Sequence, residues 1–274
     1  MTLHFTDLPR PLLVGSLRNR TTAETIADMK SGESDGARAF ILHLQLLDQP
    51  YRQPEELRKI FTATRYPMMA INYRCDGGPS DDERVNMLLQ ATRVGAKCID
   101  LPADTFDLDS RKSLAGCTLP FAAADPEEIS MRPECIDKQM QIIKQVHALD
   151  AQVLMSAHAL NTHLDCTQAV SLATEMESRG ADIVKIVTDC PTVDHALEML
   201  RTTVELRKRL KVPFVYICTG PHGEIVRPLA PLLGSMLVFG HHDYHERANL
   251  RKQLLGNLRE LYRIIPWRID DYLE

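Results

Sequence analysis

Residues 165–187 read DCTQAVSLATEMESRGADIVKIV, and this stretch contains the unit from which the whole chain is built. Its first part, Asp165–Arg179, has the apolar spacing of a helix, and the following Gly180 is a typical helix terminator. Its second part, Ala181–Val187, is a short and almost entirely apolar run. Strands of a parallel sheet are covered on both faces and therefore read as continuous apolar runs. The stretch thus predicts a helix that leads into a buried parallel strand.

The same alternation continues in both directions along the chain. Eight apolar runs are expected to form strands, roughly Pro11–Ser16, Ala39–Leu47, Pro67–Tyr73, Lys97–Leu101, Gln152–Ser156, Ala181–Val187, Pro213–Cys218 and Ser235–Phe239. The expected helices are Thr21–Gly32, Pro54–Thr64, Ser80–Val94, Pro133–Leu149, Asp165–Arg179, Thr192–Leu210 and Ala248–Ile264, with a short one near Pro228–Leu233. Strands that alternate with helices predict a parallel sheet, and closing eight of them gives a (β/α)8 TIM barrel, an α/β fold. An open doubly wound sheet is the alternative, but no GxGxxG follows any strand.

The length of the chain fits this fold as one domain. A (β/α)8 barrel takes about 250 residues, and the chain has 274, so residues 1–274 are predicted to form a single domain. One segment, Asp104–Arg132, interrupts the alternation after the fourth strand and is rich in proline and acidic residues. Loops of this length are usually functional or disordered. We read it as an insertion on the active-site face that could act as a lid.

Composition and charge narrow the class of protein. Apolar residues make up 44% of the chain and charged residues 25%, as in ordinary soluble proteins. The net charge of −5 gives no basic excess for a nucleic-acid partner. No apolar run reaches the roughly 18 residues of a membrane span, and the first eleven residues do not resemble a signal peptide. The seven cysteines are scattered without a CxxC pair, which is typical of reduced thiols in the cytoplasm.

Lys185 and His158 are the strongest candidates for chemistry. In a barrel the catalytic side chains lie at the C-terminal ends of the strands. Lys185 interrupts an apolar strand, and burial disfavours the charged form of an amine, which leaves it able to form a Schiff base with a ketone. His158 follows the neighbouring strand, and histidine is the usual general acid–base near neutral pH. A lysine that pairs with a carboxylate and a hydrogen-bonded loop histidine are the alternatives.

Other polar side chains also fall at predicted strand ends. An arginine can hold a carboxylate through two parallel hydrogen bonds, or it can form an ordinary surface salt bridge. The further candidates for binding a substrate are Arg74, Arg227, His43, Gln45 and His241.

Several of these motifs together resemble the type I 3-dehydroquinate dehydratase family. The likeness covers most of the chain apart from Asp104–Arg132. It rests on Met155-Ser156-x-His158, Ala181-Asp-Ile-Val-Lys-Ile186, Asn72-Tyr73-Arg74 with Gly77-Gly78, Thr219-Gly220-x-x-Gly223-x-Ile225-x-Arg227, and Phe239-Gly240.

The resemblance implies a (β/α)8 enzyme of the shikimate pathway and of aromatic amino acid biosynthesis. Lys185 would form an imine with the C3 ketone of the substrate, and His158 would assist imine formation and transfer protons. Arg227 would bind the substrate carboxylate, and Arg74 would contact substrate hydroxyls. The reaction needs no metal and no cofactor. We expect a small cyclic keto acid as ligand, neither nucleic acid nor a membrane as partner, and a homodimer.

The sequence departs from the family at the residues that read the substrate. The family carries Glu-x-Arg-x-Asp on its second strand, where this chain has His43-Leu44-Gln45-Leu46-Leu47. The family's Glu helps to bind substrate hydroxyls, and its Arg supports the site. After the last strand the family has a segment with Ser and Gln, where this chain has His241-His-Asp-Tyr-His245. His43, Gln45 and His241 therefore take these places, and we expect a diverged dehydratase that acts on 3-dehydroquinate or a related cyclic keto acid.

Three other functions remain open at this point. His43, His241 and His245 could hold zinc in a metal-dependent barrel hydrolase. A catalytically silent binding protein would explain the replaced residues of the second strand. A Schiff-base aldolase would use the same lysine to cleave a carbon–carbon bond.

Overall fold

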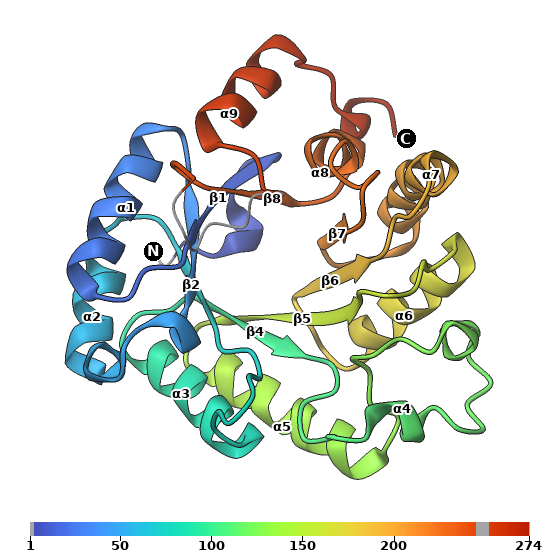
Figure 1. Ribbon diagram of the computed structural model, residues 1–274, viewed down its shortest axis with the longest axis horizontal. Helices are drawn as coiled ribbons and strands as arrows, with labels where there is room; N and C mark the ends of the chain where they lie inside the picture. Colours follow the sequence, from blue (N-terminus) through green and yellow to red (C-terminus); the bar gives the residue numbers. More distant parts are fainter. Residues whose placement is uncertain (1–2, 245–251, 274) are drawn as a thin grey trace. The chain divides into compact units, whose positions relative to one another are not determined.

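The computed structural model describes residues 3–244 and 252–273, and within these ranges eight strands alternate with helices (Figure 1). The strands are β1 (Leu12–Leu17), β2 (Ala39–His43), β3 (Met68–Ile71), β4 (Cys98–Pro102), β5 (Gln152–Ala159), β6 (Ile183–Thr188), β7 (Phe214–Cys218) and β8 (Leu237–Gly240). The helices are α1 (Thr22–Ser34), α2 (Pro54–Thr62), α3 (Asp81–Arg93), α4 (Ser110–Ser113), α5 (Pro133–Ala148), α6 (Cys166–Ser178), α7 (Val193–Arg209), α8 (Val226–Leu229) and α9 (Leu255–Ile264).

The strand order along the sheet is β7-β6-β5-β4-β3-β2-β1-β8, so neighbours in sequence are neighbours in the sheet except at its ends, where β8 pairs with β1. The pairs β1–β2, β1–β8, β2–β3, β3–β4, β5–β6 and β6–β7 are all parallel. This is the topology of a (β/α)8 barrel, and the predicted fold class is confirmed.

The chain divides into two compact units. The first comprises residues 1–100, 145–152 and 237–266, and the second comprises residues 101–144, 153–236 and 267–274. That residues 1–274 fold as one domain stays a prediction, and the two units are described one at a time.

The first unit is built around β1, which pairs with β2 on one side and with β8 on the other. Gly15 stands opposite Phe40 of β2, and a Cβ atom at Gly15 would lie 2.5 Å from a carbon of the Phe40 ring, so the packed ring requires glycine there. The first helix begins at a capping box, as the sequence predicts. The Thr21 side chain accepts a hydrogen bond from the Glu24 amide, and the Glu24 carboxylate accepts one from the Thr21 amide.

The second unit contains the parallel strands β5, β6 and β7, with α6 and α7 between them in sequence (Figure 1). The register places Ser156 opposite Lys185 and His158 opposite Val187. All side chains of β6 and β7 are buried, as expected for central strands of a parallel sheet.

Most element boundaries lie within two residues of those expected from the sequence, and three differ by more. The apolar run at 39–47 is a strand only to His43 and continues as a 3-10 turn over Leu44–Leu46, because buried leucines suit either conformation. Strand β5 extends to Ala159, which places His158 inside the strand. The helix expected from Ala248 is described from Leu255, and residues 248–251 lie outside the described residues.

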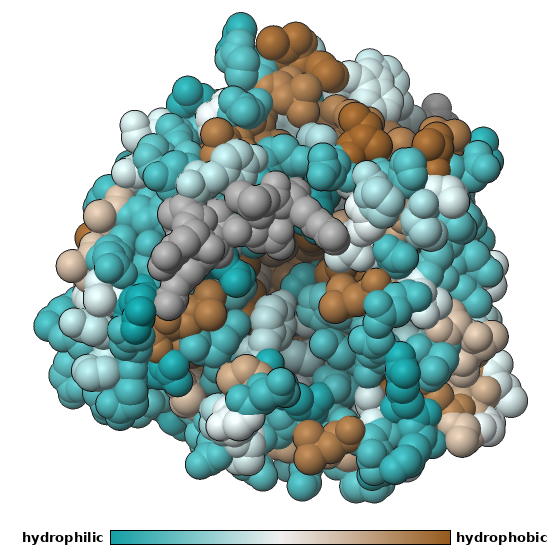
Figure 2. Space-filling view, in the orientation of Figure 1, coloured by the Kyte–Doolittle hydropathy of each residue, from teal (hydrophilic) through white to brown (hydrophobic). Residues whose placement is uncertain are grey.

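The insertion at 104–132 is part of the second unit, and it packs against α6. It contains α4 and a 3-10 turn, Pro120–Ala124, and its Phe121 and Ile129 side chains are fully buried. The surface drawn in Figure 2 is mostly hydrophilic, with apolar groups scattered over it. In the part of the chain that the structure describes, no helix has both the length and the apolar character needed to cross a membrane.

Candidate active site

Lys185 and His158 share one face of the sheet in the second unit. Lys185 is paired with Ser156, and His158 lies two residues further along the same strand as Ser156. Because alternate residues of a strand project to the same face, the side chains of Ser156, His158 and Lys185 lie on one side. Strand spacing and rise separate the Cα atoms of His158 and Lys185 by about 8 Å. Lys185 is buried, and His158 is largely so.

A carboxylate that the sequence did not suggest holds the ring of His158. Glu128 Oε2 lies 2.5 Å from His158 Nδ1. When Nδ1 carries a proton and donates it to the carboxylate, Nε2 is the nitrogen left for proton transfer. The imidazole of His158 is therefore arranged to act as a base, and the carboxylate of Glu128 orients it. Glu128 belongs to the insertion, and nothing in its local sequence distinguishes it from the adjacent Glu127.

The segment that carries Glu128 is anchored on a buried arginine. Arg179 is only 2% exposed, and its guanidinium donates to the carbonyl oxygens of Ser130 (2.8 Å) and Ala103 (3.2 Å). It also donates to the Gln139 side chain (3.0 Å) and to the Glu175 carboxylate (3.0 Å). Burial lowers the pKa of Arg179, and Glu175 opposes that shift. These bonds fix both ends of the insertion near α6.

Arg227 lies beside the end of β7 in the same unit. It is the second residue of α8. Its positive charge lowers the pKa of the Cys218 thiol and so partly offsets the effect of burial. Burial dominates there and raises the pKa of Cys218 to about 12, while the neighbouring Cys190 adds to the rise. Arg227 thus stands on a short helix that packs against β7, and the sequence predicted it to bind a carboxylate.

In the first unit, His43 and Gln45 take part in a chain of polar contacts. The Gln45 amide nitrogen lies 3.4 Å from His43 Nδ1, and Ser16 Oγ lies 3.5 Å from His43 Nε2. Ser16 in turn accepts a hydrogen bond of 2.8 Å from Lys252 Nζ. Sequence reasoning missed Ser16 and Lys252, because neither lies in a motif.

The remaining candidates of the first unit, Arg74 and His241, form hydrogen bonds within that unit. The Arg74 guanidinium forms two parallel hydrogen bonds with Asp81, of 2.9 and 2.5 Å, which is the salt-bridge alternative. Tyr73 donates to the buried Asp100 at 2.7 Å. His241 is buried at the end of β8 and is bridged through its backbone to Leu254.

The histidines proposed for a metal site are placed differently from one another. His43 belongs to the polar chain with Ser16, His241 to the bridge at the end of β8, and His245 falls outside the described residues. Over residues 3–244 and 252–273, no group of three or more His, Cys, Asp or Glu side chains is arranged to hold one metal ion.

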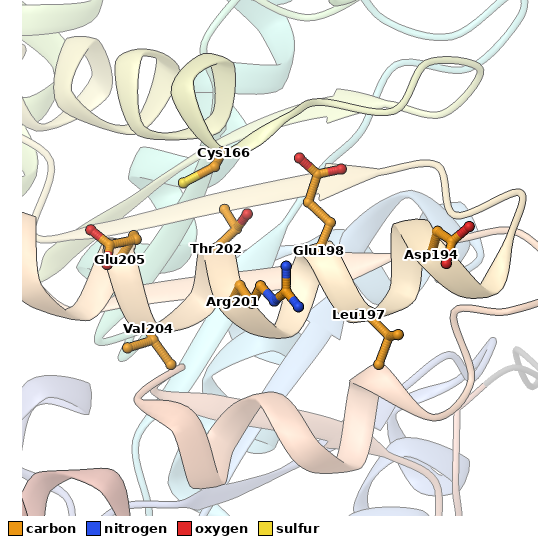
Figure 3. A pocket seen from close by; sticks show the side chains of 8 residues that line it. All are labelled: Cys166, Asp194, Leu197, Glu198, Arg201, Thr202, Val204 and Glu205. Carbon is orange, nitrogen blue, oxygen red and sulfur yellow. The ribbon is translucent and has the colours of Figure 1, made fainter.

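A groove of about 760 Å³ lies along α7, on helices and away from the strand ends (Figure 3). Its lining residues are Cys166, Asp194, Leu197, Glu198, Arg201, Thr202, Val204 and Glu205. Apart from Cys166 at the start of α6, all come from α7, so the groove contains none of the strand-end residues described above.

The chain is similar in sequence to proteins of a known family. The sequence model of the family described as Type I 3-dehydroquinase matches residues 15–265. A 3-dehydroquinate dehydratase of Clostridium kluyveri (strain NBRC 12016) is 32% identical over 143 residues, which cover 52% of this chain and 52% of that protein. The chain thus spans about half the length of that relative. A 3-dehydroquinate dehydratase of Dehalococcoides mccartyi (strain CBDB1) is 24% identical over 241 residues, 86% of this chain and 89% of that protein.

Solved structures give the same likeness at the level of the fold. The 3-dehydroquinate dehydratase of Geobacillus kaustophilus HTA426 superimposes with a TM-score of 0.75 at 12% identity, over 99% of this chain and 97% of that chain. The type I 3-dehydroquinate dehydratase of Clostridium difficile, solved with covalently modified comenic acid, gives a TM-score of 0.75 at 15% identity, over 96% and 97% of the two chains.

Proposed function

The chain belongs to the type I 3-dehydroquinase family, and from this premise we propose that it is a Schiff-base dehydratase, which removes water from 3-dehydroquinate or a related cyclic keto acid. The observation that carries the proposal is the shared sheet face of Lys185 and His158, with Glu128 held at Nδ1 of the imidazole. A buried amine next to an oriented imidazole is the pair of groups that imine chemistry requires.

The proposed reaction conserves atoms and charge. The neutral amine of Lys185 attacks the C3 ketone, and uptake of one proton from the protonated His158 with loss of one water gives an iminium. A base removes the proton at C2, and the iminium takes up the electron pair. The resulting enamine expels the C1 hydroxyl, which leaves as water after His158 supplies a proton. Hydrolysis of the new iminium returns the neutral amine of Lys185, releases the unsaturated product and gives back the proton that was taken up at the start.

Arg227 is proposed to bind the substrate carboxylate, because a guanidinium suits a carboxylate and α8, which carries it, packs against β7. Arg74 is proposed to contact substrate hydroxyls, and its two hydrogen bonds to Asp81 would hold it in place for that role. His43, Gln45 and His241 remain proposed substrate contacts in the first unit.

The test is to trap the imine. The protein is incubated with 3-dehydroquinate and sodium borohydride, and its intact mass is measured beside that of Lys185→Ala and of Lys208→Ala. Lys208 is a half-exposed lysine paired with Glu205 on α7 and serves as the matched control. We expect a mass gain in the parent protein and in Lys208→Ala, and none in Lys185→Ala. An adduct that persists without Lys185 would refute the assignment.

Turnover separates the dehydratase from the other enzymes and from a silent relative. Absorbance of the conjugated product reports dehydration, whereas an aldolase would give two smaller fragments in product analysis. An adduct without turnover would favour a binding protein.

Each of the seven cysteines is a free thiol. Since thiols persist in a reducing compartment, we infer a cytoplasmic location, which cell fractionation would test. The homodimer stays a prediction, and light scattering of the purified protein would test it.

A further inference from the structure

Two arginines meet at one tyrosine ring in the first unit, just before the strands β2 and β3. The guanidinium carbon of Arg38 lies 5.3 Å from the centroid of the Tyr66 ring, and that of Arg65 lies 5.0 Å from it. Both are cation–π contacts. The two guanidinium carbons therefore lie no farther apart than the sum of these distances, and their like charges repel each other.

The backbone holds this group at the N-terminal ends of the strands. Arg38 directly precedes β2, and its amide donates to the carbonyl of Leu13 at 3.1 Å. Tyr66 stands two residues before β3, and its amide donates to Thr64 Oγ1 at 3.1 Å. A ligand would therefore meet cations that the fold has already positioned.

Most N–H groups of the two guanidiniums are not used by the protein. Arg38 donates through Nη1 to the carbonyls of Ala37 at 2.8 Å and Glu33 at 3.3 Å. Arg65 donates through Nη2 to the Tyr66 hydroxyl at 2.9 Å. Within the described part of the chain, neither arginine forms an ion pair with a carboxylate. Because a guanidinium has five N–H groups, each arginine keeps several donors for a ligand.

Two hollows meet at the tyrosine, since Arg65 and Tyr66 line both of them. The larger, of about 600 Å³, is also lined by Arg38 and Lys30, and the smaller, of about 290 Å³, by Lys97. Cavities that bind small molecules usually have volumes of about 300–1,000 Å³. The larger hollow therefore has room for a small organic ligand whose charged group lies at the arginines.

The charge around these hollows is positive, although the whole chain carries a net charge of −5. Four cations line them, and Glu33 is the carboxylate in their lining. Glu33 pairs with Lys30 at 3.2 Å, and Asp150 lies 3.9 Å from Lys97. These two pairs leave both arginines outside any ion pair, so a bound anion would offset their repulsion.

We propose that the hollows form a binding site for a phosphate group, held between the guanidiniums of Arg38 and Arg65. The planar N–H fork of an arginine matches two phosphate oxygens, and the Tyr66 hydroxyl can donate a further hydrogen bond. Two positive charges suit a phosphate ester, which carries about −1.5 to −2 at pH 7, better than a single carboxylate.

This site is additional to the proposed active site. It lies before β2 and β3, whereas a barrel places its catalytic side chains at the C-terminal ends of the strands. The inference therefore does not depend on the proposed function, and either one can fail without the other.

The test follows two probes, inorganic phosphate and ribose 5-phosphate, as they bind to the full chain in calorimetry at constant ionic strength. We expect saturable binding, weakened about tenfold or more in Arg38→Gln and in Arg65→Gln, because each variant loses hydrogen bonds from a charged donor. Arg58→Gln, at an exposed arginine of α2 that lines neither hollow, should bind as the parent does. No saturable binding of either probe, or equal affinity in all three variants, would overturn the proposal.

Further arms of the experiment show where the phosphate binds and what carries it. Both arginines are exposed, so their replacement should leave the fold intact, which circular dichroism of each variant checks. Arg227→Gln should bind phosphate with the parent affinity, and a loss of binding there would place the anion at the proposed active site and overturn the inference. Tighter binding of ribose 5-phosphate would identify a phosphate ester as the ligand, and tighter binding of inorganic phosphate would identify the free ion.

Discussion

The proton-transfer role proposed for His158 depends on which ring nitrogen faces the substrate, and Glu128 decides that. A carboxylate at 2.5 Å from Nδ1 favours the proton on that nitrogen and fixes the ring. The amide of Glu128→Gln can still form one hydrogen bond, but it can present its NH2 to Nδ1 and so favour the other tautomer. Glu128 thus acts through His158 as a positioning residue.

We predict that Glu128→Gln lowers kcat about tenfold or more and leaves KM nearly unchanged. The loss should stay below the roughly 10²–10⁴-fold contribution of general acid–base catalysis, because the imidazole itself remains. Steady-state kinetics with 3-dehydroquinate would measure it. Glu127→Gln is the matched control, since Glu127 pairs with Arg111 and Asn161 and not with the histidine. Equal rates for Glu128→Gln and the parent would remove Glu128 from the mechanism.

At this scale the sequence predicted candidates on strands and just after them, and it gave no signal for Glu128, which contacts His158, or for Lys252, which contacts Ser16. Lys185 and His158 could be paired because strand register follows from the alternation of elements. Glu128 and Lys252 could not, because their contacts depend on how the insertion and the segment after β8 pack. Those paths are set by tertiary bonds such as the ones to Arg179 and His241, which leave no local pattern.

Among the elements, the insertion at 104–132 is held in position by Arg179, the residue that caps the C-terminus of α6. We predict that Arg179→Met lowers the free energy of unfolding by about 3–5 kcal/mol, the usual cost of breaking a buried ion pair and leaving its partners unsatisfied. Urea denaturation would measure the loss. Arg209→Met, an exposed arginine near Glu205, should change stability by less than about 0.5 kcal/mol. A small effect at Arg179 would mean that other contacts suffice to hold the insertion.

The N-terminal cap of α1 gives a second test at the element scale. Thr21→Ala removes the side-chain oxygen that accepts from the Glu24 amide, and should cost about 1 kcal/mol of stability. Thr174→Ala, at an exposed threonine inside α6, removes a hydroxyl that bonds only to the preceding turn and should cost much less. Thermal denaturation of the two variants side by side would decide; equal costs would mean that the capping hydrogen bond contributes little.

Elements were predicted well where apolar runs were bounded by capping or terminating residues, as at Thr21 and Gly180. Prediction was poorer where a run of leucines passed from strand into turn, because burial alone does not select between extended and 3-10 backbone. The end of β2 differs from expectation for this reason, whereas β5 continues past its apolar run through His158 to Ala159. The difference matters for function, since it moves Gln45 off the strand and His158 onto it.

For the molecule as a whole, buried thiols and a buried tyrosine of the second unit are expected to make the protein less stable at alkaline pH. Burial raises the pKa of the Cys135, Cys190 and Cys218 thiols and of the Tyr216 hydroxyl, and that of Cys218 reaches about 12. Each group binds its proton more tightly in the folded than in the unfolded protein. Their contribution to stability is therefore complete below pH 9 and is lost as the pH rises toward the folded pKa.

We predict that the free energy of unfolding falls between pH 9 and 12 and that Cys218→Ala makes the fall shallower. Over that range the unfolded thiol is ionised and the folded one is not, so Cys218 alone contributes a slope of about 1.4 kcal/mol per pH unit. The variant is expected to be less stable at neutral pH because it leaves a cavity, so the slope and not the absolute value is the readout. Urea denaturation at several pH values would give it. Cys75→Ala, at an exposed cysteine, should keep the parent slope; an unchanged slope in Cys218→Ala would show that this thiol ionises alike in both states.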